Sequence, residues 1–254
     1  LIEAAYNQRI SEATKNDDKV TKNTTRIGAL SNLQTLSTSL QTSLTKLRTN
    51  YSLLSDPSVF NLKSGTFTTA TTGVNPSSFV SVSIDNDAVP GTYSVQVNAL
   101  ASAQKVRSTS FADATTTQNL NGNFQIGLAG GASTSIAVTA GMSLNDIASA
   151  INAQKNTTNV SASVLQVSPG QYQLYLTANQ TNKQIVTSVD SGDDVLQSIG
   201  ITNGGGTFVN QVQPASAAQI TVDNVLFTRD SNAFSDVIDG VNFDLLTANP
   251  GVTY

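Results

Sequence analysis

The first 55 residues constrain the fold most, because they predict one long helix that is too polar to be stable alone. They contain one Gly and no Pro, and their apolar residues recur at steps of three and four. From Leu40 onward the steps follow a heptad seam, and the phase slips near Gly28, where we expect a bend or a stutter. The candidate assembly face of this helix comprises Ile27, Leu33, Leu36, Leu40, Leu44, Leu47, Tyr51 and Leu54.

This face is narrow, and Ser, Thr, Asn and Gln fill much of the remaining helix surface. A long helix in a protein is stabilised mainly by packing of its apolar face. No other segment predicts a helix of similar length. We therefore expect the partner helices to come from other subunits or from sequence outside this chain.

The charge pattern changes near residue 56. Residues 1–55 have a net charge of +3 and residues 56–254 one of −7, and no Glu follows Glu12. Ser55-Asp56-Pro57 adds a helix stop, so we predict a boundary there. The overall charge of −4 argues against nucleic acid or anionic membranes as partners. No apolar run approaches the roughly 20 residues of a membrane-spanning helix.

Residues 57–254 predict mostly β structure, because short alternating runs recur between Gly, Pro and Asn. Val89-Pro90-Gly91 and Ser168-Pro169-Gly170 predict turns. A last β segment starts at Gln219. The earlier predicted strands are Phe79–Ile84, Thr92–Val97, Phe124–Leu128, Ile136–Thr139, Val160–Gln166 and Tyr172–Thr177.

One predicted helix interrupts this β region. Ser143-Leu144-Asn145-Asp146 has the form of a capping box, with Asp in place of the usual Glu or Gln. Leu144, Ile147, Ala148 and Ile151 then share one face. With the flanking strands, this helix forms a β-α-β-β unit. Gly204-Gly205-Gly206 predicts a flexible link after it.

The composition excludes much enzyme chemistry. The chain has no Cys and no His, which removes thiolate nucleophiles, imidazole bases and the usual zinc ligands. Asp236 and Asp239 lie three positions apart and are expected on a short helical turn, where capping is favoured over a glycosidase role. Asp190-Ser191-Gly192-Asp193-Asp194 lacks the spacing of a calcium loop. We predict no catalytic residue, no cofactor and no metal ligand, and hence no enzyme.

Four segments resemble known flagellar proteins. The block Ser143–Asn152, continued by Val160–Val164 and Tyr172–Thr177, resembles the IN motif of flagellins and hook-associated proteins. Pro90–Ala101 resembles the opening of the second domain of the flagellar filament cap (FliD) family. The remaining matches to that family are its closing β segment, Thr221–Asn224, Arg229–Asn232 and Ser235–Val241, and its early helix, Leu1–Ala4.

The resemblance implies an α+β fold in which a long coiled-coil-type helix precedes two mostly antiparallel β-rich domains. Residues 1–56 would form a helical leg domain. Residues 57–111 and 214–254 would form an inner domain. Residues 112–213 would form an outer domain that is inserted in the inner one and contains the IN motif and the β-α-β-β unit.

The resemblance also implies a function. It predicts a structural protein at the distal end of the bacterial flagellar filament, where a homo-oligomeric cap retains exported flagellin and promotes its insertion. Flagellin and further copies of the chain would be the partners. The protein would be extracellular and exported without a cleavable signal peptide, because the N-terminal residues lack a basic start and an apolar stretch.

Two alternatives remain open. One is a carbohydrate-binding adhesin that would bind host glycans, which requires a coplanar cluster of exposed aromatic side chains. The other is a different flagellar axial or hook-associated protein, because such proteins share the IN motif.

Overall fold

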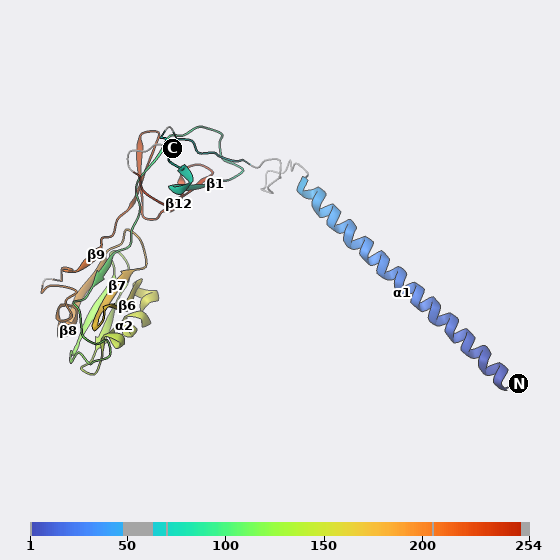
Figure 1. The fold of residues 1–254 in the computed structure, drawn as a ribbon, viewed down its shortest axis with the longest axis horizontal. Coiled ribbons are helices and arrows are strands. Elements are labelled where there is room, and N and C mark those ends of the chain that lie inside the picture. Colours follow the sequence, from blue (N-terminus) through green and yellow to red (C-terminus); the bar gives the residue numbers. More distant parts are fainter. Residues whose placement is uncertain (1, 48–62, 70, 205, 250–254) are drawn as a thin grey trace. The chain divides into compact units, whose positions relative to one another are not determined.

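The computed structural model describes residues 2–47, 63–69, 71–204 and 206–249, with the backbone alone for Lys46 and Leu47. The chain divides into two compact units, Leu1–Lys63 and Ser64–Tyr254 (Figure 1). The predicted helix stop at Ser55-Asp56-Pro57 lies outside the described residues.

In the described part of the first unit, residues 2–47 form one helix, α1 (Ile2–Leu47). The predicted long helix is confirmed. Of the bend or stutter expected near Gly28, the bend is absent, because α1 continues straight through this residue (Figure 1), and the stutter stays a prediction. An isolated Gly costs helix stability of about 1 kcal/mol without having to break the helix. Threonine hydroxyls along α1 donate to carbonyls four residues earlier, at Thr14, Thr24, Thr25, Thr35, Thr38, Thr42 and Thr45.

The second unit has two buried cores, and we call the parts around them the first lobe (64–101 and 217–249) and the inserted lobe (102–216). In the first lobe, β1 (Val80–Ile84) pairs antiparallel with β13 (Val241–Leu245). Strand β2 (Val95–Ala99) pairs antiparallel with β10 (Ala218–Val222). Both pairs join sequence from either side of the inserted lobe, which confirms the predicted insertion. The lobe also contains η2 (Pro76–Ser78), β11 (Val225–Arg229) and β12 (Ala233–Ile238).

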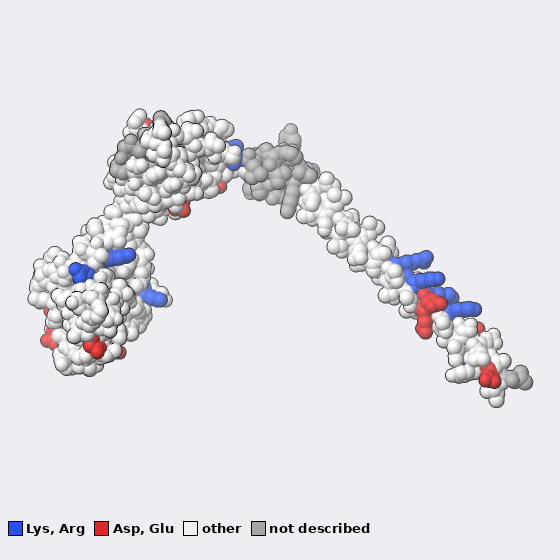
Figure 2. Space-filling view, viewed as in Figure 1, with Lys and Arg blue, Asp and Glu red and all other residues white. Residues whose placement is uncertain are grey.

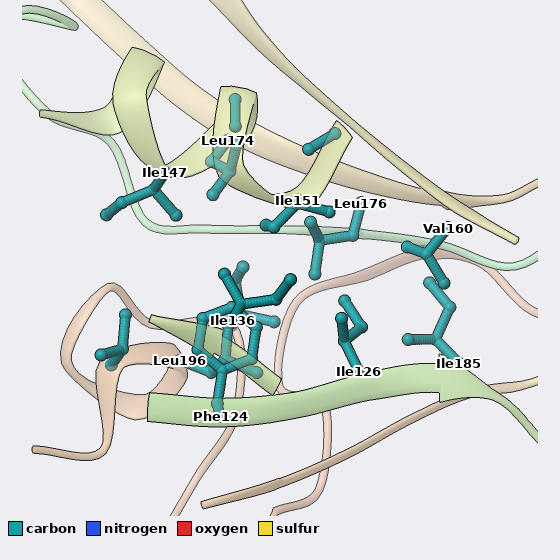
Figure 3. Close-up of a cluster of buried hydrophobic side chains, with 14 of the residues drawn as sticks. Phe124, Ile126, Ile136, Ile147, Ile151, Val160, Leu174, Leu176, Ile185 and Leu196 are labelled. Atoms are coloured by element: carbon teal, nitrogen blue, oxygen red, sulfur yellow. The ribbon is translucent and has the colours of Figure 1, made fainter. Parts of the chain in front are cut away.

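The inserted lobe contains two antiparallel sheets, of strand orders β6-β7-β3-β9 and β5-β4-β8. Their inward side chains and one face of α2 form a single core, part of which is shown in Figure 3. The predicted β-α-β-β unit is present as β5, α2, β6 and β7, with the extra turn α3 after α2. The elements are β3 (Lys105–Arg107), β4 (Gly122–Leu128), β5 (Ser133–Val138), α2 (Leu144–Ala153), α3 (Lys155–Thr158), β6 (Val160–Ser168), β7 (Gln171–Ala178), β8 (Ile185–Gly192), α4 (Val195–Ser198) and β9 (Gln211–Gln213).

Both ends of α2 are tied to their surroundings by side chains. Ser143 and Asp146 form the predicted capping box, in which each side chain bonds the other residue's backbone N–H. These hydrogen bonds from Ser143 lower the pKa of the Asp146 carboxyl. Near the other end, Asn152 Nδ2 donates to the Ala162 carbonyl at 2.7 Å, and the Ala162 N–H donates to Asn152 Oδ1 at 2.9 Å. Asn152 thus occupies the edge of β6 as a neighbouring strand would.

The structure differs from three expectations. Strand β3 pairs with β7 and β9, so it belongs to the inserted lobe, whereas the family resemblance implied an inner domain that included residues 57–111. A strand of only three residues is too short for its sequence pattern to predict which sheet it joins. Gly204 and Gly206 lie beside a hydrogen-bonded turn instead of in a flexible link, and Gly205 lies outside the described residues. The Asn203 N–H donates to the Thr207 carbonyl and the Gly206 N–H to the Asn203 carbonyl, each at 2.9 Å. Asp236 lies in strand β12 instead of a helical turn.

A cluster of polar contacts joins the two lobes. Lys183 Nζ lies 2.9 Å from Asp230 Oδ2, and Asn182 Nδ2 donates to Asp230 Oδ1 at 2.7 Å. The Thr181 hydroxyl donates to the Asp230 carbonyl. These donors, with Lys183 the strongest, hold the pKa of the Asp230 carboxyl below its usual value. Ser102 and Ser216 add a β-bridge between the two connecting segments.

Candidate assembly surface

The predicted assembly face of α1 is exposed along its whole described length. Ile27, Leu33, Leu36, Leu40 and Leu44 are each between 56% and 67% exposed. Leu47 ends α1, but its side chain lies outside the described atoms, and Tyr51 and Leu54 lie outside the described residues. Six of the eight predicted residues therefore lie on one continuous helix, and the five whose side chains are described are all exposed.

Residues 27–45 of this helix combine exposed apolar side chains with polar side chains that carry no charge. Residues 27–45 contain no charged side chain, and Figure 2 shows the corresponding end of α1 without Lys, Arg, Asp or Glu. Leu30, which the sequence analysis did not include, is 65% exposed and extends the apolar surface. Large apolar surfaces of this kind mark protein contacts. Within the described residues, no helix is long and apolar enough to cross a membrane.

The other half of α1 carries a group of cations that the sequence analysis also missed. Lys15, Lys19, Lys22 and Arg26 are spaced by four, three and four residues and are all exposed. This spacing places them on one side of the helix. In Figure 2 a row of Lys and Arg side chains projects from one side of this half of α1. The spacing of these four cations is visible in the sequence, but the net charge summed over residues 1–55 does not show that they share one side of the helix.

Three carboxylates of the β-rich unit take part in structural contacts. Asp236 Oδ1 accepts from Arg229 Nε at 2.8 Å, which lowers the pKa of that carboxyl. Asp190 Oδ2 accepts from the Ser135 hydroxyl at 2.6 Å, and Asp194 caps α4. Among the described residues, no group of three or more acidic side chains could hold a metal ion.

Among the described residues, the stacked pair Phe234 and Phe243 does not form an exposed sugar-binding platform. Phe234 and Phe243 have ring centroids 5.7 Å apart, but Phe243 is buried in the core of the first lobe. Tyr175 bonds Gln173 on its own strand through its hydroxyl. These contacts give no support to the adhesin alternative.

Comparison with known proteins identifies two family models within the chain. The N-terminal model of flagellar hook-associated protein 2 matches residues 1–104, and the flagellin hook IN motif matches residues 123–180. The chain is 29% identical over 244 residues to B-type flagellar hook-associated protein 2 of Pseudomonas aeruginosa, covering 87% of this chain and 46% of that protein. It is 33% identical over 204 residues to flagellar hook-associated protein 2 of Escherichia coli K12, covering 78% and 42%.

Solved structures show the same relationship. The D2–D3 domains of the flagellar cap protein FliD from E. coli align with a TM-score of 0.61 at 27% identity, covering 73% of this chain and 93% of that one. The D1–D2–D3 structure from E. coli gives 0.60 at 29% identity, covering 73% and 52%. These structures confirm the predicted α+β architecture. The chain spans about half the length of the curated relatives it matches. From both sequence and fold, the chain belongs to the flagellar hook-associated protein 2 (FliD) family.

Proposed function

We propose that this chain is the helical and β-rich part of a subunit that caps the distal end of the flagellar filament. The subunits assemble with one another, retain exported flagellin at the filament tip and promote its insertion. The protein acts outside the cell, and it works by shape and contact instead of bond chemistry. The observation that carries this proposal is the likeness of the β-rich unit to the D2–D3 domains of a flagellar cap protein.

The apolar face of α1 supports the assembly step. Its leucines are exposed in the isolated chain, and burying a leucine side chain typically stabilises a contact by about 1.5–3 kcal/mol. The absence of charge over residues 27–45 lowers the cost of removing this surface from water. Partner helices from other subunits would cover it.

Deletion of the gene in its own bacterium tests the function. The deletion strain should release flagellin into the medium and lack filaments, and the wild-type gene should restore both. A deletion strain that still builds normal filaments and retains its flagellin would contradict the proposal.

A helix variant tests the assembly face separately. Leu36→Asp, Leu40→Asp and Leu44→Asp together should lower the oligomer mass of the full-length protein in sedimentation, and the β-rich unit should stay folded by circular dichroism. Thr35→Asp, Thr38→Asp and Thr42→Asp add the same charge on the opposite side of the same helix. This control should leave the mass unchanged. An equal response to both variants would show that the leucine face is not the assembly surface.

A further inference from the structure

Met142 carries the single sulfur atom of this chain, which has one Met and no Cys. It directly precedes Ser143, the N-cap of α2, in the turn that leads from β5 into this helix. A hydrophobic side chain at this position often packs onto the first turns of the helix that follows. Here the side chain is partly buried and packs against the core of the inserted lobe. Its thioether therefore lies at the boundary between the core and the surface.

The sulfur also helps to close the turn. The Thr139 N–H donates to Met142 Sδ at 3.3 Å, and the Met142 N–H donates to the Thr139 carbonyl at 2.9 Å. A thioether is only a weak hydrogen-bond acceptor. Because its sulfur has two lone pairs, the contact with Thr139 leaves one of them available for reaction.

The turn is exposed on one side and tied to the lobe on the other. Thr139, Ala140 and Gly141 are exposed, and a Cβ added at Gly141 would meet no atom within 4 Å. On the inner side, the Met142 carbonyl accepts from the Gln118 N–H at 2.9 Å. This arrangement gives a small oxidant a route to the turn, and it connects the turn to a neighbouring segment of the lobe.

We propose that Met142 is the oxidation-sensitive site of this chain and that its sulfoxide loosens the start of α2. A lone pair on Sδ attacks one oxygen of hydrogen peroxide, and the O–O bond breaks as the S–O bond forms. The proton of the attacked hydroxyl passes to the leaving one, which departs as water. The sulfur is oxidised by two electrons and the peroxide is reduced, and an apolar side chain becomes polar. This modification does not depend on the cap proposal.

The sulfoxide disturbs both contacts of the side chain. A polar S=O group against apolar side chains is unfavourable unless it gains a hydrogen bond. The new oxygen fits beside the Thr139 N–H only if the side chain moves, because the sulfur itself already lies at 3.3 Å. Two neighbouring backbone bonds should weaken as a result, from the Gln118 N–H to the Met142 carbonyl and from the Ile147 N–H to the Ser143 carbonyl.

Oxidation of the full chain, followed by peptide mass spectrometry and hydrogen exchange, tests the inference. Dilute hydrogen peroxide should add one oxygen atom to the folded chain at Met142, more slowly than to the same chain unfolded in urea. The amides of Gln118 and Ile147 should then exchange about fivefold faster or more. The amide of Ile220, in the first lobe, should not change. Reduction by methionine sulfoxide reductase should restore the original exchange.

Two variants separate the chemistry of the sulfur from the polarity of its product. Met142→Leu keeps a similar apolar volume without sulfur, so it should take up no oxygen and show no response to peroxide. Met142→Gln places a polar side chain of similar length in the turn. It should reproduce the faster exchange of Gln118 and Ile147 without any peroxide.

Three results would overturn the inference. The first is no oxygen uptake by the folded chain under conditions that oxidise the unfolded chain. The second is uptake at Met142 without faster exchange at Gln118 and Ile147. The third is an equal exchange response to peroxide in Met142→Leu.

Discussion

Asn152→Ala should destabilise the inserted lobe, because this side chain satisfies both backbone groups of Ala162 at the edge of β6. Ala162 is 7% exposed, so its N–H and carbonyl have little access to water. Leaving buried polar groups without partners costs about 1–3 kcal/mol each, with smaller values where water can enter at an edge. Alanine is a better helix former than asparagine by roughly 0.6 kcal/mol, which offsets part of the loss. We expect a net loss of about 2 kcal/mol in the free energy of local opening.

Native-state hydrogen exchange measures this loss directly. Because the chain has more than one core, a single unfolding transition is not assumed, and exchange is followed residue by residue. The Ala162 amide should exchange roughly 30-fold faster in the variant, which corresponds to about 2 kcal/mol. Amides of the first lobe, such as that of Ile220, should not change.

Asn145→Ala is the matched control, since it makes the same substitution at an exposed position of the same helix. It should leave protection of Ala162 unchanged or slightly increased. If both variants have the same effect on Ala162, or if neither has any, the argument that Asn152 replaces a neighbouring strand is refuted.

Three further changes have defined outcomes. Ser143→Ala removes the cap of α2 and should cost about 1 kcal/mol in local stability, measured by hydrogen exchange in that helix. Gly240→Ala should destabilise the first lobe by more than about 1 kcal/mol in urea unfolding, because the φ of Gly240 is +70° and an added Cβ would lie 2.5 Å from the Ala88 Cα. Gly28→Ala should instead raise the stability of α1 by up to about 1 kcal/mol, because an added Cβ at this helical position meets no other atom within 4 Å. Asp230→Asn should speed exchange in residues 181–183 and 230–232. Because the folded pKa of Asp230 is lowered, its contact with Lys183 should persist above about pH 4 and weaken below it in the wild type, while the variant should show no such pH response.

Sequence patterns predicted the elements whose signals are local. The long helix, the capping box of α2 and the turn at Ser168-Pro169-Gly170 each depend on residues within a few positions of one another. The buried face of α2 was predicted from helical spacing, and Leu144, Ile147 and Ile151 are fully buried. The leucine face of α1 remains a prediction, supported by its exposure.

The features that were missed depend on distant or combined information. The pairing of Asn152 with Ala162 joins residues ten apart across a helix and a strand, and neither residue type predicts it alone. The contact of Asp230 with Lys183 joins the two lobes through loops, which carry no periodic signal. The row of cations Lys15, Lys19, Lys22 and Arg26 could have been recognised in the sequence. Recognising it requires that charges be counted along each face of the helix instead of over the whole segment.

The sequence by itself determined the long polar helix with its narrow apolar face, the alternating strands and the absence of Cys and His chemistry, because these follow from residue types and short-range periodicity. Only the tertiary structure decided that β3 joins β7 and β9, and that Asn152 closes the edge of β6. It also decided that Asp230 links the lobes. Each of these three contacts depends on which backbone and side-chain groups still lack hydrogen-bond partners once the sheets have formed. The set of such groups is determined by the assembled core and not by any single segment.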